Sequence, residues 1–389
     1  MRIVTGFLLI SFVIVISLSC AEDNSLPAYE SPSPSQPISP SSSSHPKIAS
    51  WLSKKDQIIE SQKPFDLITA AFFMPDEAKR IRETNPDTLL LAGLTTNWVW
   101  ENENWKKTLT TFASHGRDKT LEIQDNMYLT KPNGEKCPFG WTSENWGHEE
   151  IYAMDPRNPE WVDLVVAYYK MVLEQPQHDG IIIDMVTETS LCQQAISDEE
   201  WITATKEVFR RIAEVNQNDK LVLFNAGKDF SEIDTYAEFF DGYFMENFMG
   251  EILKSSYEEG LQAANSNYIV IYAMDTDNTG IQDMNEMRLG LTLSLLNDNT
   301  YFAYDFGPRD HGQAWWFPEY EIELGNPLGT YYEKDDAYWR AFENGMVISS
   351  PNSSVQFSFD TVHTDVTTGN RSRTFTVDPG DGRVYLKAG

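Results

Sequence analysis

Two acidic residues end apolar runs near the middle of the chain. Asp184 follows three isoleucines in the run DGIIIDMV, and Glu246 follows Met245 in the run DGYFMENF. An ionisable group within apolar sequence costs free energy unless it is paired or lies at an opening of the fold. One such acid is usually a cap on a strand-to-helix turn, but two in matching positions, each in a run that starts with Asp-Gly, favour a shared chemical role.

The chemistry that suits such a pair is cleavage of a glycosidic bond. One carboxyl group must donate a proton to the leaving oxygen, and the other must attack the sugar or activate water. The separation decides the outcome: about 5 Å predicts retention of configuration, whereas about 6.5–9.5 Å leaves room for a water and predicts inversion.

The elements that would position these acids repeat along the chain. Short apolar runs alternate with longer amphipathic segments such as Trp161–Leu173, a pattern typical of parallel strands that are covered by helices on both faces. The expected strands are Asp66–Phe73, Thr88–Thr95, Met127–Thr130, Gly180–Val186, Leu221–Ala226, Gly242–Phe248, Tyr268–Met274 and Thr300–Asp305.

Eight such units in roughly 250 residues predict an α/β fold, a (β/α)8 TIM barrel. The third strand is the weakest of the eight, and Ile151–Met154 is a second extended candidate. A doubly wound open sheet is the alternative, but no G-x-G-x-x-G follows the first strand.

In a barrel of this kind the active site lies at the carboxyl ends of the strands. That places Asp184 on the fourth strand and Glu246 on the sixth as the catalytic candidates. The substrate-binding candidates near the same ends are acids, amides, a histidine and loop tryptophans. The tryptophans are included because sugar rings can stack on indoles. They are Asp275, Asp305, Asn225, Asn247, His311, Trp98, Trp100, Trp141, Trp146, Trp315 and Trp316.

Composition excludes several other classes of protein. The 389 residues include 59 Asp+Glu against 30 Lys+Arg, a net charge of −29, which argues against binding nucleic acid. There is no G-x-S-x-G elbow, H-E-x-x-H motif or P-loop, and the histidines are scattered without metal-ligand spacing. We therefore expect no cofactor and no metal.

The amino-terminal segment is typical of an exported protein. Arg2 precedes an uncharged run at residues 6–19, which is the length of a signal-peptide core. The run ends at Ser19-Cys20 and resembles a bacterial lipoprotein signal, which predicts lipidation at Cys20; simple secretion is the alternative. We expect a signal peptide at 1–20, a Ser/Pro-rich tether at 21–46 and an extracytoplasmic protein whose one membrane contact is the lipid anchor.

The remaining chain divides into a catalytic barrel at 47–340 and a carboxy-terminal β appendage at 341–389. In the latter, strands with alternating polarity and a Pro-Gly-Asp-Gly turn at 379–382 predict a small antiparallel sheet. Cys137 and Cys192 lie in the loops after the third and fourth expected strands. They could form a disulfide in an exported protein, although we expect two free, buried thiols.

Several motifs together resemble glycoside-hydrolase-like family 15, which is similar to endo-α-1,4-polygalactosaminidase-type and α-galactosidase-type barrels. They are Asp155–Trp161 (DPRNPEW), Asp179–Val186 (DGIIIDMV), Gly242–Phe248 (GYFMENF), His311–Gly325 (HGQAWWFPEYEIELG) and Phe342–Gly345 (FENG), and the resemblance covers roughly residues 50–389. It implies a TIM barrel, glycosidase activity and retention. Asp184 would be the nucleophile, and Glu246 the acid/base, where those relatives commonly use Asp.

Two functions are consistent with these features. The first is an extracytoplasmic glycoside hydrolase that cleaves an oligo- or polysaccharide by a two-carboxylate mechanism. The second is a non-catalytic carbohydrate-binding lipoprotein. The first requires Asp184 and Glu246 to reach one glycosidic oxygen. The negative charge predicts a neutral or amino sugar as the ligand.

Overall fold

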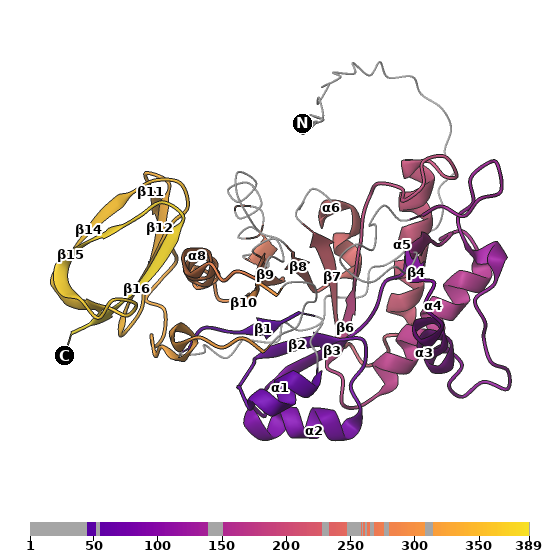
Figure 1. Cartoon of the computed structure of the whole chain (residues 1–389), viewed down its shortest axis with the longest axis horizontal. Coiled ribbons are helices and arrows are strands. Elements are labelled where there is room, and N and C mark those ends of the chain that lie inside the picture. Colours follow the sequence, from indigo (N-terminus) through magenta and orange to yellow (C-terminus); the bar gives the residue numbers. More distant parts are fainter. Residues whose placement is uncertain are drawn as a thin grey trace, which may run out of the picture. The chain divides into compact units, whose positions relative to one another are not determined.

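The computed structural model describes residues 45–51, 55–138, 151–227, 233–246, 258, 260, 263–264, 268–275, 280–307 and 314–388. Its main feature is an eight-stranded parallel sheet (Figure 1). The strands follow one another in the order β1 (Ala49–Ser50), β2 (Leu67–Ala70), β3 (Leu89–Ala92), β6 (Gly180–Ile183), β7 (Leu221–Gly227), β8 (Gly242–Met245), β9 (Ile269–Asp275) and β10 (Thr300–Asp305). A parallel bridge between Ile48 and Phe302 joins the two edge strands. The predicted TIM barrel is confirmed.

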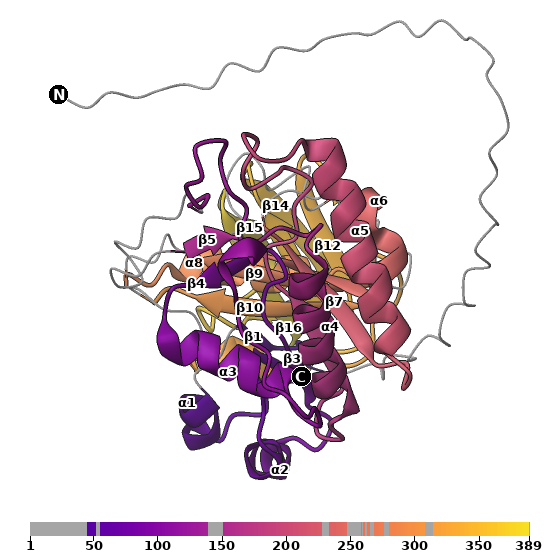
Figure 2. The same cartoon turned by 90° about the vertical axis from the view of Figure 1, so that its right-hand side faces the viewer.

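Helices follow most of these strands along the chain. They are α1 (Lys55–Ser61), α2 (Pro75–Thr84), α3 (Glu103–Ala113), α4 (Pro159–Glu174), α5 (Asp198–Val215), α6 (Ile233–Tyr236) and α8 (Met284–Ser294). Their starts are encoded locally: Ser197 and Glu200 form a capping box before α5, and Asn158 caps α4, whose first residue is proline. Helices α3, α4 and α5 pack side by side (Figure 2).

The barrel interior is filled by alternate residues of its strands. Ile182, Leu223, Phe244 and Ala303 belong to one buried cluster with Ala49, Leu67, Leu91 and Ile271. Side chains two residues apart on a strand point the same way, so Asp184, Asn225, Glu246 and Asp305 continue this interior column at the carboxyl end. The same alternation that builds the core thus places polar side chains above it.

The run expected as the first strand, Asp66–Phe73, contains the barrel strand β2, but the strand before it was missed, and the expected third strand lies outside the barrel. The first barrel strand, β1, has only two residues, too few to show a periodic pattern. Residues 127–130 lie outside the barrel, where Tyr128 and Thr130 form isolated antiparallel bridges to Met154 and Lys136. One strand was missed and one was counted in error before β6, so the strand count is unchanged there. Asp184 and Glu246 therefore still follow the fourth and sixth barrel strands.

A short antiparallel ribbon lies between β3 and α4 in the sequence. It pairs β4 (Trp98–Trp100) with β5 (Ile151–Ala153), the second extended candidate for the third strand. Leu129 and Cys137 extend it through backbone hydrogen bonds with Ala153. Cys137 therefore lies on this ribbon, and its disulfide partner, Cys192, lies in the loop that follows Asp184.

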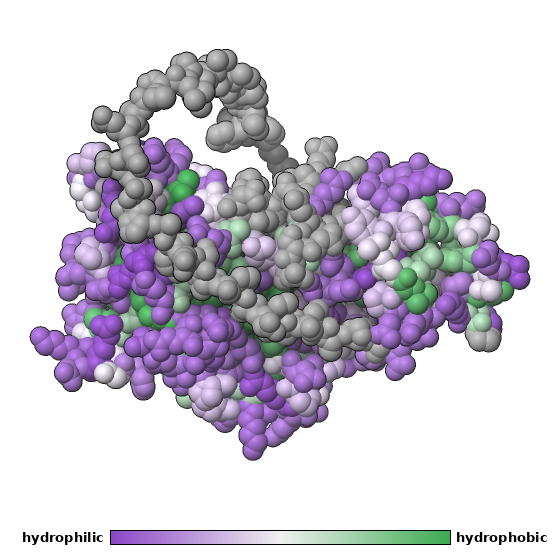
Figure 3. Space-filling model, turned by 180° about the vertical axis from the view of Figure 1, so that it is seen from behind, coloured by the Kyte–Doolittle hydropathy of each residue, from purple (hydrophilic) through white to green (hydrophobic). Residues whose placement is uncertain are grey.

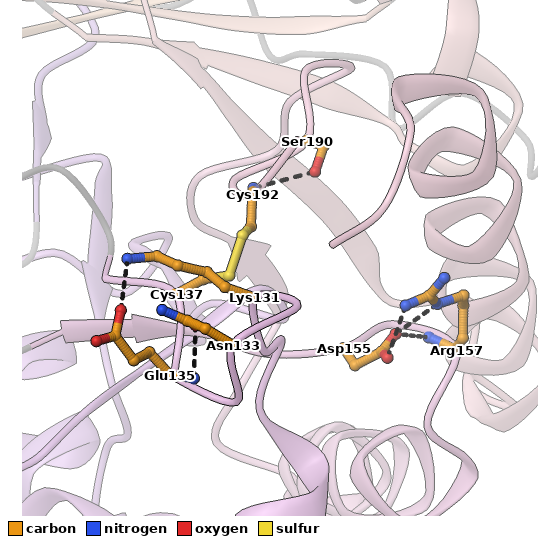
Figure 4. Close-up of a disulfide and its surroundings, with 8 residues drawn as sticks. All are labelled: Lys131, Asn133, Glu135, Cys137, Asp155, Arg157, Ser190 and Cys192. Carbon is orange, nitrogen blue, oxygen red and sulfur yellow. Dashed lines mark hydrogen bonds and ion pairs between the residues drawn. A yellow bond between two sulfur atoms is a disulfide. The ribbon is translucent and has the colours of Figure 1, made fainter. Parts of the chain in front are cut away.

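The bond between Cys137 and Cys192 is formed, so the expectation of two free thiols is wrong (Figure 4). The Cα atoms are 6.0 Å apart, within the usual range for a disulfide. Both cysteines are buried in a small cluster with Leu129, Ile196 and Trp201. The ribbon and the loop after β6 approach each other only in the folded barrel, which explains why the spacing of the cysteines along the chain could not decide the pairing.

The carboxy-terminal region forms the predicted antiparallel sheet. It has six strands in the order β11 (Tyr332–Lys334), β12 (Ala337–Ala341), β13 (Gly345–Ser350), β16 (Asp381–Lys387), β14 (Val355–Asp365) and β15 (Arg371–Val377), and so begins at Tyr332. It packs against α8, where the buried Arg288 donates two hydrogen bonds to Asp381. A cluster around Ile348, Val377 and Tyr385 gives the sheet a core of its own.

The residues coloured by hydropathy in Figure 3 form a mainly hydrophilic surface on the face shown. Within the residues that the structure describes, none of the helices combines the length and the apolar character needed to cross a membrane.

Candidate active site

The centre of the site is a shared hydrogen-bond donor. The Asn225 Nδ2 atom donates to Asp184 Oδ1 at 2.8 Å and to Glu246 Oε2 at 2.7 Å. The two carboxylate oxygens are therefore at most 5.5 Å apart, the sum of those distances. Asn225 is only 1% exposed, whereas both acids are partly exposed at the strand ends. The structure thus brings Asp184 and Glu246 together around one amide.

The orientation of this amide is fixed by the strand that carries it. The Gly227 N–H donates to Asn225 Oδ1 at 2.8 Å, so the Nδ2 end must face the acids. Strand β7 is irregular here, because its register against β8 shifts between Asn225 and Gly227. Gly227 has φ +63°, which glycine adopts without strain. Such bulges often lie next to active sites and redirect a side chain.

Asp184 is held by both neighbouring strands. Its backbone N–H donates to the Leu94 carbonyl at 3.1 Å, and the Val186 N–H donates to the Asn225 carbonyl at 3.2 Å. The hydroxyl of Tyr169, on α4, donates a hydrogen bond to the same Leu94 carbonyl. Burial raises the pKa of Tyr169 well above its usual value, and the charge of Asp184 contributes to the rise. This tyrosine therefore stays neutral.

Two further acids lie at the ends of neighbouring strands. Asp305 ends β10, is 9% exposed and accepts a hydrogen bond from the Gly307 N–H at 3.0 Å. In the parallel register it is paired with Asp275 at the end of β9. For Asp275 the structure describes only the backbone. Asn247 and His311 lie outside the described residues.

The four predicted tryptophans that the structure describes have different ring partners. Trp98 stacks on Trp105 of α3, with ring centroids 6.0 Å apart, and packs edge-on against Trp100. Trp315 stacks on Phe306, just beyond β10, at 4.1 Å. Trp316 lies elsewhere, because its ring packs at 5.2 Å against Phe65, which precedes β2. Trp141 and Trp146 lie outside the described residues.

Acids at the opposite, amino ends of the strands have a different role. Asp179 Oδ2 accepts hydrogen bonds from the Leu90 N–H at 2.7 Å and from Arg82 at 2.6 Å. Asp241 Oδ2 accepts from the Val222 N–H at 2.9 Å. The Asp-Gly pairs that open β6 and β8 are therefore part of the strand pairing. They do not signal catalysis.

Metal binding has no evident site in the described ranges, where His, Cys, Asp and Glu side chains nowhere gather in threes around a position for an ion. His178 is buried and bonded to backbone through both ring nitrogens, to the Phe73 N–H and the Val172 carbonyl. Its pKa is lowered by burial. These contacts give His178 a structural role at the amino end of β6.

Sequence comparison adds the family. Residues 82–346, more than half of the chain, match the profile of hypothetical glycosyl hydrolase family 15. The chain belongs to this family. The resemblance predicted from the sequence motifs is confirmed. Among curated proteins, none matches this member of hypothetical glycosyl hydrolase family 15.

Solved structures with a similar fold include glycoside-cleaving enzymes. An alpha-amylase from Malbranchea cinnamomea has 10% identity and a TM-score of 0.50, with 86% of this chain and 88% of that one covered. AmyB, a noncanonic maltogenic alpha-amylase from Thermotoga neapolitana, has 9% identity and a TM-score of 0.49, with 90% and 100% covered. Aspergillus fumigatus Ega3, in complex with galactosamine, has 8% identity and a TM-score of 0.45, with 72% and 97% covered. At 10% identity, the likeness of the family 15 chain to the Malbranchea cinnamomea enzyme concerns the fold alone.

Proposed function

We propose that this protein is a glycoside hydrolase that cleaves an oligo- or polysaccharide with Asp184 and Glu246. The observation that carries the proposal is the single Asn225 amide nitrogen, which donates to both carboxylates. Membership of a glycoside-hydrolase-like family and a barrel of the kind found in glycosidases support it. The acids lie where the active sites of such barrels are found.

The spacing supports a retaining mechanism. An upper limit of 5.5 Å between the bridged oxygens favours the separation of about 5–5.5 Å between carboxyl groups that retaining glycosidases use over the gap of about 6.5–9.5 Å in inverting ones. In the first step Asp184 attacks the anomeric carbon and Glu246 protonates the leaving oxygen. In the second step Glu246 takes a proton from water, which displaces Asp184 and releases the sugar.

The shared amide also distinguishes the oxygens of each acid. Glu246 Oε2 and Asp184 Oδ1 accept the two N–H groups of Asn225. The transferable proton of Glu246 therefore belongs on Oε1, and Asp184 attacks through Oδ2. Asn225 was a substrate-binding candidate, and in this proposal its amide hydrogens instead position the two acids.

For the substrate class we propose a neutral or amino sugar. Asp184, Glu246 and Asp305 bring negative charge to one end of the barrel, and a focused negative field repels uronates and sulfated glycans. A steered cationic substrate should lose kcat/KM as salt is added, whereas a neutral one should not.

For the location we propose an exported protein that is anchored through Cys20. The disulfide supports export, because such bonds persist in oxidising compartments. Replacing Cys20 with alanine should move the protein from the membrane fraction to the soluble fraction and remove the lipid mass from its amino terminus.

The roles of the two acids can be tested by chemical rescue. The wild type is first screened against a polysaccharide panel to find a substrate and the anomer that forms first. With that substrate, Asp184→Ala plus azide should give a glycosyl azide of inverted configuration, because the small anion replaces the nucleophile. Glu246→Ala plus azide should give one of retained configuration, because the anion then attacks the glycosyl-enzyme.

Asp179→Asn is the matched control, since it alters an acid at the other end of the same strand. It should need no azide and form no glycosyl azide. An inverted product from the wild type, or equal activity of Asp184→Ala and the wild type without azide, would exclude the proposed mechanism.

A further inference from the structure

The residue after Asp184 has an unusual backbone conformation. Met185 has φ +58°, in the left-handed region that side chains other than glycine and asparagine rarely occupy. Such conformations persist only where the surrounding structure enforces them. Because Met185 directly follows Asp184, the group that holds Met185 also limits how far the end of β6, and Asp184 with it, can move.

The group that holds Met185 is the side chain of Asn97. Its Nδ2 donates to the Met185 carbonyl at 2.7 Å, and Asn97 is only 2% exposed. Asn97 follows β3, the strand that pairs with β6 on the side opposite Asn225. The two residues after Asp184 are therefore held from both sides. The Asn97 side chain, after β3, holds Met185, and the Asn225 carbonyl, in β7, holds Val186.

Asn97 is itself fixed at all of its polar atoms. The Thr96 hydroxyl donates to Asn97 Oδ1 at 2.8 Å, which directs Nδ2 toward Met185. The Asn97 N–H donates to the Thr95 hydroxyl at 3.0 Å, and its carbonyl accepts from the Met154 N–H at 2.8 Å. All three residues of this Thr-Thr-Asn segment are buried. A buried network with every member bonded is rigid.

We propose that Asn97 is a positioning residue for Asp184, which acts by holding Met185 in its left-handed conformation and thereby keeps the Asp184 carboxylate on Asn225 and opposite Glu246. Asn97 need not touch the substrate. Its importance for turnover rests on the function proposed above, whereas its effect on the geometry of Asp184 does not.

The test compares Asn97→Ala with Met185→Gly and with the double variant. Asn97→Ala should lower kcat about 10- to 100-fold with little change in KM, as expected for a displaced catalytic group. Glycine at position 185 adopts the left-handed conformation without help, so Met185→Gly in the Asn97→Ala background should restore most of the lost kcat. Asp241→Asn, which alters an acid at the opposite, amino end of the barrel, controls for loss of stability alone and should leave kcat unchanged.

Crystal structures of the same variants give a readout that does not depend on activity. In Asn97→Ala, Met185 should leave the positive φ region and the distance from Asp184 to Asn225 should exceed hydrogen-bond length; both should return in the double variant. If the wild type is active and Asn97→Ala keeps its kcat, the proposal for Asn97 fails while the proposed function stands. If the wild type cleaves no glycan, the proposed function fails, and the structures still decide: an unmoved Met185 refutes the role of Asn97.

Discussion

The two ends of the barrel use the same residue types for different purposes. At the amino end, Asp66, Asp179 and Asp241 each accept a hydrogen bond from the backbone N–H of a neighbouring strand or the segment leading into it. At the carboxyl end, Asp184 and Glu246 instead accept from a side chain, Asn225.

This difference has a physical basis. A backbone N–H at a strand end is fixed by the sheet, so an acid bonded to it is part of the strand pairing. A side-chain amide can lie between two acids and bring their charges close together, which opposes folding but serves catalysis. Whether an acid next to a strand is structural or catalytic is therefore indicated by its hydrogen-bond donor, a backbone N–H or a side-chain amide. The position of the acid in the sequence does not identify that donor.

The largest expected effect tests the comparison directly. Asp184→Asn and Glu246→Gln should each lower kcat by about 10³-fold or more, because each removes a group that acts only in the reaction. Asp179→Asn and Asp241→Asn should keep kcat near the wild-type value. Steady-state kinetics on the best substrate of the panel, together with urea unfolding of each variant, give the answer. A kcat loss in the amino-end variants as large as in the carboxyl-end variants would remove the distinction.

The disulfide sharpens the comparison, because it joins loops at the carboxyl end. Cys192 lies eight residues after Asp184, and the bond spans 55 residues of sequence. Its loss in the variant with serine at both positions should reduce the free energy of unfolding by about 2–4 kcal/mol and lower kcat as well. Urea unfolding with and without dithiothreitol measures this. The reductant should affect the wild type only, and equal midpoints for fully reduced and oxidised wild type would contradict the prediction.

The pH dependence of stability tests the amino end. Burial raises the pKa of Asp66 to about 6, so the folded state holds this proton more tightly than the unfolded state does. Stability from this group is therefore present below about pH 4 and is lost as the pH rises through 6, by up to about 3 kcal/mol. Asp66→Asn should lack this loss. The comparison is made as the difference between the two proteins, measured by urea unfolding from pH 4 to pH 8.

His178 acts in the opposite direction in the same range. Burial lowers its pKa, so its contribution to stability is lost as the pH falls below about 6.5. Because Asp66→Asn leaves His178 in place, the difference between wild type and variant cancels the histidine. A pH profile of Asp66→Asn parallel to that of the wild type would show that Asp66 titrates normally.

The smallest expected effect concerns Asp179. Replacing it with alanine leaves the Leu90 N–H without its carboxylate acceptor and breaks the ion pair with Arg82, at a cost of about 1–3 kcal/mol in the free energy of unfolding. Arg82→Ala, which breaks only the partly exposed ion pair, should cost about 1 kcal/mol or less. Equal losses in the two variants would place the stabilisation in the ion pair and not in the strand cap.

Much of the site could be predicted from the chain alone. Near-continuous apolar runs such as Ile181–Ile183 require a parallel sheet that is covered on both faces, and an acid directly after such a run must lie at its carboxyl end. The period of two then directs Asp184, like Ile182 before it, into the barrel axis. These are local properties, and they placed both candidate acids at one end of a barrel.

Other features depend on contacts between distant segments. Strand β1 has two residues and exists because β2 and β10 flank it. Met127 ends a 3-10 helix, and the bridges of Tyr128 and Thr130 are to Met154, just after β5, and to Lys136, so this segment lies outside the barrel. The Cys137–Cys192 bond follows from the meeting of the ribbon of β4 and β5 with the loop after β6.

The position of each side chain's hydrogen-bond partner was likewise decided by the tertiary structure. Asn225, Asp184 and Glu246 are far apart in sequence, and their shared bonds form because β7 pairs with β6 on one side and with β8 on the other. Asn97 and Met185 are 88 positions apart. The sequence therefore determined which acids end the strands, because side-chain direction repeats along a strand. Only the closed barrel determined what those acids bind, because hydrogen bonding depends on distances between segments that the chain order leaves open.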